Sequence, residues 1–150
     1  MSRLKKISII LVIILIAMQF IQPRRNRQDK ITARTDMPEN IKRILSRSCF
    51  DCHSNNTRYP WYSSIQPVSW ILEYHIKKGK ADLNFDEFAN YSERRQLNKL
   101  RSIQTSMKEG SMPVSSYLLI HHDAKLSAAE KTMITEWAQR MDDSISHKKT

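Results

Sequence analysis

Residues 49–53 read CFDCH, and this pentapeptide decides how the rest of the chain is interpreted. Cys49 and Cys52 are the two cysteines of the chain, and His53 directly follows the second. On a helix, positions i, i+3 and i+4 project from one face, so the thiols and the imidazole would meet the same partner. This geometry suits a planar group bound by two thioether bonds along one edge, with an imidazole nitrogen at its centre.

The spacing C-x-x-C-H is the attachment signature of haem c. We therefore predict one covalent haem c per chain, attached through Cys49 and Cys52, with His53 as the proximal iron ligand. A thioredoxin-like redox pair would lie near a βαβ pattern, which the sequence lacks. A structural zinc site needs four ligands, and the third and fourth would have to come from His75, His121 or His122. A disulfide at this spacing closes too small a loop to stabilise the fold well.

Met112 is the predicted distal iron ligand. It follows a helix-ending glycine and precedes Pro113, which keeps Met112 out of the α-helical region and presents it from a loop. The alternative distal ligand is His75, on the apolar face of a predicted helix. Histidine–methionine ligation closes both axial positions and suits electron transfer. An open or weakly held sixth position would suit the binding of small ligands.

The rest of the chain is predicted to be all-α. Only two glycines occur, Gly79 and Gly110, which argues against a hairpin-rich β fold. Each glycine directly follows a predicted helix, as helix-terminating glycines do. Apolar residues recur at helical spacing in four stretches: residues 37–53, 67–78, 92–109 and a helix that opens at Ser127 with the capping-box partner Glu130.

The N-terminal residues are strongly apolar and predict an uncleaved transmembrane helix. The stretch 7–21 has only Ser8 and Gln19 as polar interruptions, with Lys and Arg on both sides. It lacks the small residues of a signal-peptide cleavage site and is slightly short for a bilayer. The expected organisation is a membrane anchor over 1–22, a linker over 23–36, a haem domain over 37–143 and a basic tail over 144–150.

The positive charge of the chain gathers near its N-terminus. The formal net charge is +10, of which residues 1–30 supply +6, from seven Lys or Arg and one Asp. This distribution favours a membrane-associated segment over a nucleic-acid interface. Because haem c is attached outside the cytoplasmic membrane of bacteria, the expected location is the inner membrane. The N-terminus would then be cytoplasmic and the haem domain periplasmic.

The sequence resembles the single-haem "haem-binding domain" proteins, which are small membrane-anchored c-type cytochromes of bacteria. The resemblance covers about residues 37–140, and four stretches carry it: CFDCHSNNTRYPWYSSIQPVSW, HIKKGKADLNFDEF, KEGSMPVSSY and HHDAKLSAAEKTMITEWA. It implies a fold similar to class I cytochrome c, attachment through Cys49 and Cys52, His53 as iron ligand and Met112 in the distal position.

Further roles follow from likeness to class I cytochromes, in which a proline carbonyl often accepts a hydrogen bond from the proximal histidine. Pro67 is the better candidate here and Pro60 the other. Aromatic side chains are expected to wall the haem pocket, and these are Tyr59, Trp61 and Trp70.

The predicted function is electron transfer by a membrane-tethered carrier that is not itself an enzyme. Lys and Arg near the haem edge would steer it to acidic redox proteins. The first alternative is a haem-based sensor or small-ligand binder in which Met112 is labile. The second is a thiol–disulfide oxidoreductase that uses Cys49 and Cys52. A two-haem peroxidase is disfavoured because the chain carries a single C-x-x-C-H motif.

Overall fold

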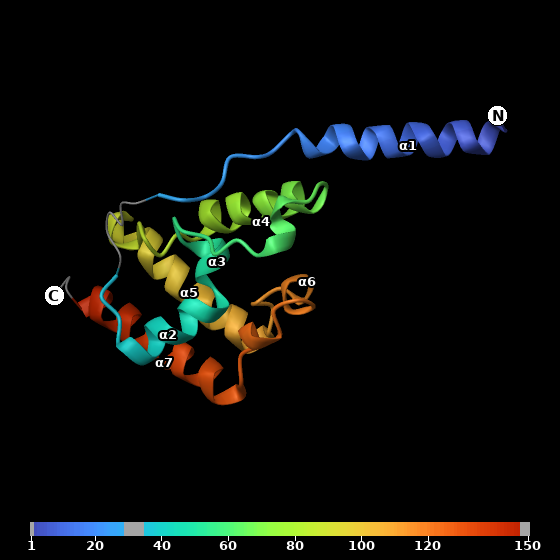
Figure 1. The fold of residues 1–150 in the computed structure, drawn as a ribbon. Coiled ribbons are helices and arrows are strands. Elements are labelled where there is room, and N and C mark those ends of the chain that lie inside the picture. Colours follow the sequence, from blue (N-terminus) through green and yellow to red (C-terminus); the bar gives the residue numbers. More distant parts are fainter. Residues whose placement is uncertain (1, 29–34, 148–150) are drawn as a thin grey trace.

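A computed structural model describes residues 2–28 and 35–147 of the chain, and the predicted all-α fold is confirmed (Figure 1). Residues 29–34 of the predicted linker and 148–150 of the predicted tail lie outside the described residues. In the described residues the β structure is limited to an isolated bridge between Arg27 and Asn56. The α-helices are α1 (Arg3–Gln19), α2 (Glu39–Ser48), α3 (Phe50–His53), α4 (Val68–Asp82), α5 (Glu93–Glu109), α6 (Ser115–Leu118) and α7 (Ala128–His147). The described residues also form short 3-10 helices, which are η1 (Trp61–Ser64), η2 (Phe88–Asn90) and η3 (His122–Ala124).

Helices α5 and α7 pack against each other and form the base of the helical core. Leu100 of α5 and Ile134 of α7 are fully buried in this contact. The predicted C-terminal end of α5 and the predicted start of α7 are confirmed. Gly110 closes α5 in the left-handed conformation, at φ 66°. Ser127 and Glu130 form the reciprocal capping box at the start of α7, with hydrogen bonds of 2.8 and 3.2 Å.

Two helices differ from the prediction. The first predicted helix breaks at Cys49, whose φ of −131° ends α2 and opens the separate short helix α3. The second continues beyond Gly79 to Asp82. Gly79 is therefore an interior residue of α4, where α3 passes very close. A Cβ atom at Gly79 would lie 2.7 Å from the Cys52 carbonyl oxygen, so glycine permits this crossing.

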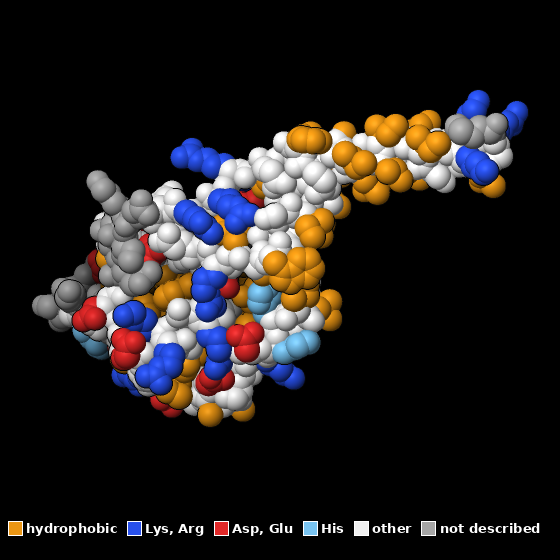
Figure 2. Space-filling model, in the orientation of Figure 1, with side chains coloured by type: hydrophobic (Ala, Val, Ile, Leu, Met, Phe, Trp, Pro, Cys, Tyr) orange, Lys and Arg blue, Asp and Glu red, His pale blue; other side chains and the backbone are white. Residues whose placement is uncertain are grey.

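Helix α1 projects from the body of the molecule, and none of its residues is buried (Figure 1). Its apolar side chains are exposed along its length (Figure 2). Across residues 2–28 and 35–147, no helix has both the length and the apolarity that crossing a membrane requires. The predicted transmembrane helix is thus not supported, because α1 has 17 residues where a bilayer span typically takes about 20.

Candidate functional site

The C-x-x-C-H motif lies at the junction of α2 and α3. Cys49 precedes the first residue of α3, and its carbonyl oxygen accepts hydrogen bonds from the Cys52 and His53 N–H groups, at 3.2 and 3.0 Å. The single turn of α3 therefore keeps the predicted i, i+3, i+4 relation even though the longer helix is broken. All three side chains are half-buried and line one cavity, and neither cysteine forms a disulfide.

The imidazole of His53 is held by the segment that follows α4. Its Nδ1 lies 3.0 Å from the carbonyl oxygen of Leu83. A carbonyl only accepts hydrogen bonds, so Nδ1 carries the proton and Nε2 keeps a free lone pair. Burial lowers the pKa of His53, which favours this neutral form. A neutral histidine with its Nδ1 bound to a carbonyl is the form that ligates a metal through Nε2.

The prediction that Pro67 accepts the His53 hydrogen bond is wrong. Pro67 begins α4, whereas His53 contacts Leu83 just beyond the other end of the same helix. A helix of 15 residues is about 22 Å long, so the two ends cannot reach the same imidazole. The alternative, Pro60, accepts instead from the backbone and side chain of Ser63 in η1.

A buried polar cluster, which sequence reasoning missed, fixes the Leu83 carbonyl in place. The Phe85 N–H donates to the His53 carbonyl at 2.9 Å. Asp86, which is fully buried, accepts from the Asn55 N–H at 2.9 Å, and the Asn84 amide donates to the Asn55 side chain at 2.8 Å. The signal was present in the sequence as polar residues interleaved with Phe85 in LNFDEF, because buried polar groups need partners.

The motif residues open onto a cavity of about 290 Å³. This volume lies near the lower end of the range for cofactor sites. A smaller cavity of about 80 Å³ adjoins it and shares Cys49, His53 and Met112. Residues Ser48, Cys49, Asp51, Cys52, His53, Tyr74, His75, Lys78, Gly79, Asp82, Met112, Pro113, Val114 and Tyr117 line the larger one.

Both candidate distal ligands lie at this cavity, but in different settings. Met112 is half-buried against the core and lines both the larger and the smaller cavity. His75 is exposed on α4, lines the larger cavity only and packs its ring against Tyr74. The expected apolar setting of His75 is therefore wrong, because this face of α4 looks outward. Met112 therefore shares both cavities with His53, whereas His75 shares only the larger one.

The aromatic side chains predicted to wall the pocket lie elsewhere. Trp61 is 81% exposed and lines neither cavity beside the motif. Trp70 donates to the carbonyl oxygen of Ile21, and the Tyr59 hydroxyl hydrogen-bonds Glu73. These residues lie near the motif in the sequence, but Tyr59 and Trp70 contact the N-terminal segment instead, at Asn26 and Ile21. Two other tyrosines, Tyr74 and Tyr117, line the cavity instead.

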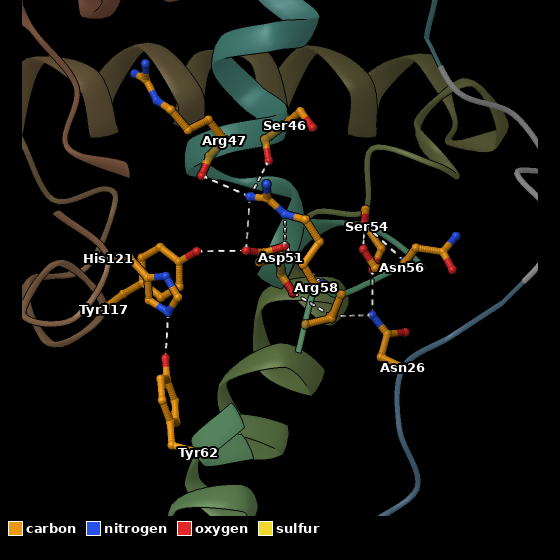
Figure 3. Close-up of polar contacts among 11 residues, drawn as sticks. Asn26, Ser46, Arg47, Asp51, Ser54, Asn56, Arg58, Tyr62, Tyr117 and His121 are labelled. Atoms are coloured by element: carbon orange, nitrogen blue, oxygen red, sulfur yellow. Dashed lines mark hydrogen bonds and ion pairs between the residues drawn. The ribbon is translucent and has the colours of Figure 1, made fainter. Parts of the chain in front are cut away.

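Asp51, between the two cysteines, joins the motif to α6 (Figure 3). The buried carboxylate accepts from the Arg58 backbone N–H at 3.1 Å and from the Arg58 guanidinium at 3.2 Å. It also accepts from the Tyr117 hydroxyl at 2.8 Å. Tyr117 in turn stacks on His121, at 4.2 Å between ring centroids. One wall of the cavity is thus hydrogen-bonded to the attachment segment.

The raised pKa values of the two thiols argue against thiol redox chemistry. Burial raises the pKa of Cys49 to about 12 and that of Cys52 to about 11. Reactive redox cysteines have lowered pKa values, because the thiolate is the nucleophile. Zinc also gains no support: in the described parts of the chain, no three side chains of His, Cys, Asp or Glu gather as metal ligands would.

A second, larger hollow of about 500 Å³ is lined by α2, α3 and the segment that follows α3. It contains none of the three motif residues, and its lining is largely charged, including Lys42, Arg43 and Arg58. It is not the candidate site for an apolar planar group, which needs a mainly apolar cavity.

The residues of the motif cavity fit an iron porphyrin. Two thiols could carry thioether bonds, the Nε2 lone pair of His53 could bind iron, and the Met112 sulfur could serve as a soft second ligand. Ser48 supplies a further observation. Its side chain is 6% exposed, lines both cavities, and its hydroxyl has no hydrogen-bond partner among the described residues. A buried hydroxyl without a partner is a group that a bound ligand could satisfy.

A family model described as "haem-binding domain" matches residues 13–140 of the chain. The chain belongs to the haem-binding domain family. The resemblance found in the sequence is thereby confirmed, and haem is the group that this helical domain binds. No curated protein and no solved structure matches the chain. The haem-binding domain match includes the C-x-x-C-H motif, the LNFDEF segment and Met112.

Proposed function

We propose that this haem-binding domain protein is a membrane-attached periplasmic c-type cytochrome with one haem, and that it carries electrons rather than catalysing a reaction. When bound, haem supplies a centre that gains and loses one electron. The observation that carries the proposal is the pairing of His53 Nδ1 with the Leu83 carbonyl at 3.0 Å, beside two unpaired thiols. This pairing prepares Nε2 to bind iron without first losing a proton.

Each residue of the site has a distinct role in this proposal. Cys49 and Cys52 hold the haem covalently, so that it stays bound in both redox states. His53 would bind the iron through Nε2, and the Leu83 carbonyl, which accepts from Nδ1–H, orients its ring and raises its basicity. Met112 would supply the second protein ligand to the iron, and a methionine in that role would raise the potential and keep exogenous ligands away. The class I cytochrome c-like arrangement remains part of the proposal.

The exposed apolar surface of α1 supports attachment to the inner membrane. Such a surface has no partner within the described chain, and lipid is the environment that would bury it. A short apolar segment is accommodated by thinning of the bilayer and by flanking Lys and Arg side chains that reach the interface. We place the N-terminus in the cytoplasm and the haem domain in the periplasm, where acidic redox proteins would be its partners.

The first experiment tests covalent attachment. The protein is produced with the bacterial c-type maturation machinery, denatured and measured by intact mass and by the reduced pyridine spectrum of the haem. We expect one haem to remain on the denatured chain. The double variant Cys49→Ser with Cys52→Ser should lose it while keeping the helical circular dichroism. Haem that dissociates from the wild-type chain on denaturation would contradict the c-type assignment.

The second experiment tests the sixth ligand and therefore the function. The reduced protein is exposed to carbon monoxide, and the visible spectrum should not change while the Met112 sulfur holds the iron. Met112→Leu keeps the apolar volume but lacks the sulfur, so its spectrum should shift. His75→Ala is the matched control and should behave like wild type. A shift in the wild-type protein would favour the ligand-binding alternative over electron transfer.

A further inference from the structure

The exposed apolar side chains of the haem domain gather in one patch. In residues 35–147, large apolar side chains are exposed only within 61–74 and 119–120. We call six of them the apolar patch: Trp61, Ile65, Val68, Ile71, Leu119 and Ile120. Trp61 and Leu119, one from each of these two sequence segments, are 81% and 75% exposed. A patch of this kind marks a surface that another apolar phase covers.

The two halves of the patch are joined to each other. Tyr62 of η1 hydrogen-bonds the His121 ring at 2.6 Å, and their ring centroids lie 6.1 Å apart. This contact brings the loop after α6 against η1 and the start of α4. The patch is therefore one continuous surface built from two distant parts of the sequence.

The same surface adjoins the base of α1. Gln19 and Gln66 exchange hydrogen bonds, at 3.0 Å from the Gln66 N–H and 3.3 Å to the Gln66 carbonyl. The Ile21 carbonyl accepts from the Gln66 amide at 2.9 Å and from the Trp70 indole at 3.0 Å. These bonds fix α1 relative to η1 and α4. Figure 2 shows apolar side chains on the end of the body from which α1 projects.

We propose that the apolar patch rests in the lipid interface of the same membrane that receives α1. The patch continues the exposed apolar surface of Phe20 and Ile21 at the base of α1. Tryptophan is enriched at membrane interfaces, and Trp61 is the most exposed residue of the patch. Arg24 and Arg25 are exposed beside it, where they complement anionic headgroups. This inference rests on the membrane attachment in the proposed function.

Contact of the patch with lipid would orient the haem cavity. Tyr74 lies on α4 one turn after Ile71 of the patch, and it also lines the motif cavity. A domain that lies on its patch therefore presents this side of the cavity close to the lipid surface. Its electron partner would then be a protein or small molecule held at the membrane, within reach of a fixed haem.

The test measures where individual positions lie relative to lipid. Full-length holoprotein is reconstituted into vesicles of phosphatidylethanolamine and phosphatidylglycerol, with Trp61→Cys or Leu119→Cys carrying a nitroxide label. Gln139→Cys, on the exposed face of α7, is the matched control. Electron paramagnetic resonance measures how strongly each nitroxide spin is relaxed by oxygen, which concentrates in lipid, and by a nickel chelate, which stays in water. We expect several-fold greater oxygen and lower nickel accessibility at positions 61 and 119, and the reverse at position 139.

Each other outcome overturns the inference in a recognisable way. Labels at 61 and 119 that match the control show a domain that swings free of the bilayer. If the labels are shielded from both agents and show spin–spin coupling between two protein molecules, a second copy of the chain covers the patch. Protein that does not float with the vesicles overturns the membrane attachment as well. The number of labels per chain, measured by mass, reports independently on haem attachment, because Cys49 and Cys52 can take a label only if they are not bound to haem.

Discussion

Asp51 is a residue with two structural tasks at the haem site. It lies in α3 between the attachment cysteines, and its carboxylate is the acceptor for both Arg58 and Tyr117. Tyr117 belongs to α6, which begins three residues after Met112. The Asp51–Tyr117 hydrogen bond thus ties the Met112 loop to the attachment segment. We consider Tyr117 a positioning residue for the distal ligand.

Tyr117→Phe should weaken this tie without removing the ring that lines the cavity. Burial and the nearby Asp51 raise the pKa of Tyr117, so its hydroxyl remains a donor at all ordinary pH values. A hydrogen bond to a charged acceptor contributes about 1.5–3 kcal/mol, and Arg58 still pairs with Asp51 in the variant. We expect a loss of about 1–2 kcal/mol in the free energy of unfolding. Reduced Tyr117→Phe should also bind carbon monoxide more readily than wild type.

The control for this prediction is Tyr62→Phe. It removes another tyrosine hydroxyl nearby, one that bonds His121 rather than Asp51. Carbon monoxide binding should stay at the wild-type level in Tyr62→Phe. If both variants bind carbon monoxide equally, the Asp51 bond does not position Met112.

At the scale of elements, the crossing of α3 and α4 depends on Gly79. Replacing it by alanine would favour an isolated helix, since alanine has the higher helix propensity. In this protein the added Cβ would lie 2.7 Å from the Cys52 carbonyl and 3.2 Å from the Cys52 Cβ. We expect Gly79→Ala to lower stability by about 1–3 kcal/mol, as overpacking does, and to reduce the yield of covalently attached haem. Lys77→Ala, at an exposed position of the same helix, should leave stability and haem yield unchanged. Urea unfolding measures the stability, and the reduced pyridine spectrum measures the yield of attached haem.

The capping box of α7 makes stability depend on pH. The Ser127 N–H, together with Arg47, lowers the pKa of Glu130 below its ordinary value of 4.5. A lowered pKa in the folded state adds stability above the unfolded pKa, and this stability is lost as pH falls through the folded value. Glutamine keeps an acceptor for the Ser127 N–H and loses only the charge, so at pH 7 we expect Glu130→Gln to cost about 0.2–1 kcal/mol, the range of a partly exposed ion pair. The difference should shrink progressively below pH 4.5, as followed by urea unfolding at each pH. A constant difference would show that the charge of Glu130 does not matter.

Local signals in the sequence predicted the C-terminal end of α5 and the start of α7, because capping depends on residues a few positions apart. Gly110 must supply a positive φ, and Ser127 and Glu130 bond each other directly. The role of Gly79 was mispredicted for the opposite reason. A glycine after an apolar stripe looks the same whether it ends a helix or admits a neighbouring chain, and only the position of α3 distinguishes the two.

In the site too, features set by neighbouring residues were predicted, and features set by tertiary contacts were not. The motif itself is contiguous, so its three residues were identified from spacing, and the cavity brings Met112 to them. The acceptor for His53 is a backbone carbonyl 30 residues away, and a carbonyl has no sequence signature. Pro67 was chosen by analogy with class I cytochromes, although the loop that contacts His53 here comes after α4 rather than before it.

At the scale of the whole molecule, the described residues between α1 and the haem domain are bound to its surface. Residues 22–28 fall mostly in the predicted linker, and residues 26–28 pair with residues 54–57, which follow α3. The Asn26 amide donates to the Ser54 carbonyl and the Thr57 hydroxyl, both at 2.9 Å, and its oxygen accepts from Lys80 at 2.7 Å. The orientation of α1 is therefore tied to the segment that follows the haem motif.

Asn26→Ala should release this segment. It removes three hydrogen bonds from a half-buried side chain, and each contributes about 0.5–1.5 kcal/mol. Trypsin cleaves after Arg24, Arg25 and Arg27 only when the backbone there opens, so cleavage should follow the open population. We expect at least about a tenfold faster appearance of these cuts, by mass spectrometry, in holoprotein carrying Asn26→Ala. Asn98→Ala, on the exposed face of α5, is the control. Equally rapid cleavage in wild type and Asn26→Ala would mean that residues 22–28 behave as a free tether, and α1 would then hold the domain near the membrane without setting its orientation.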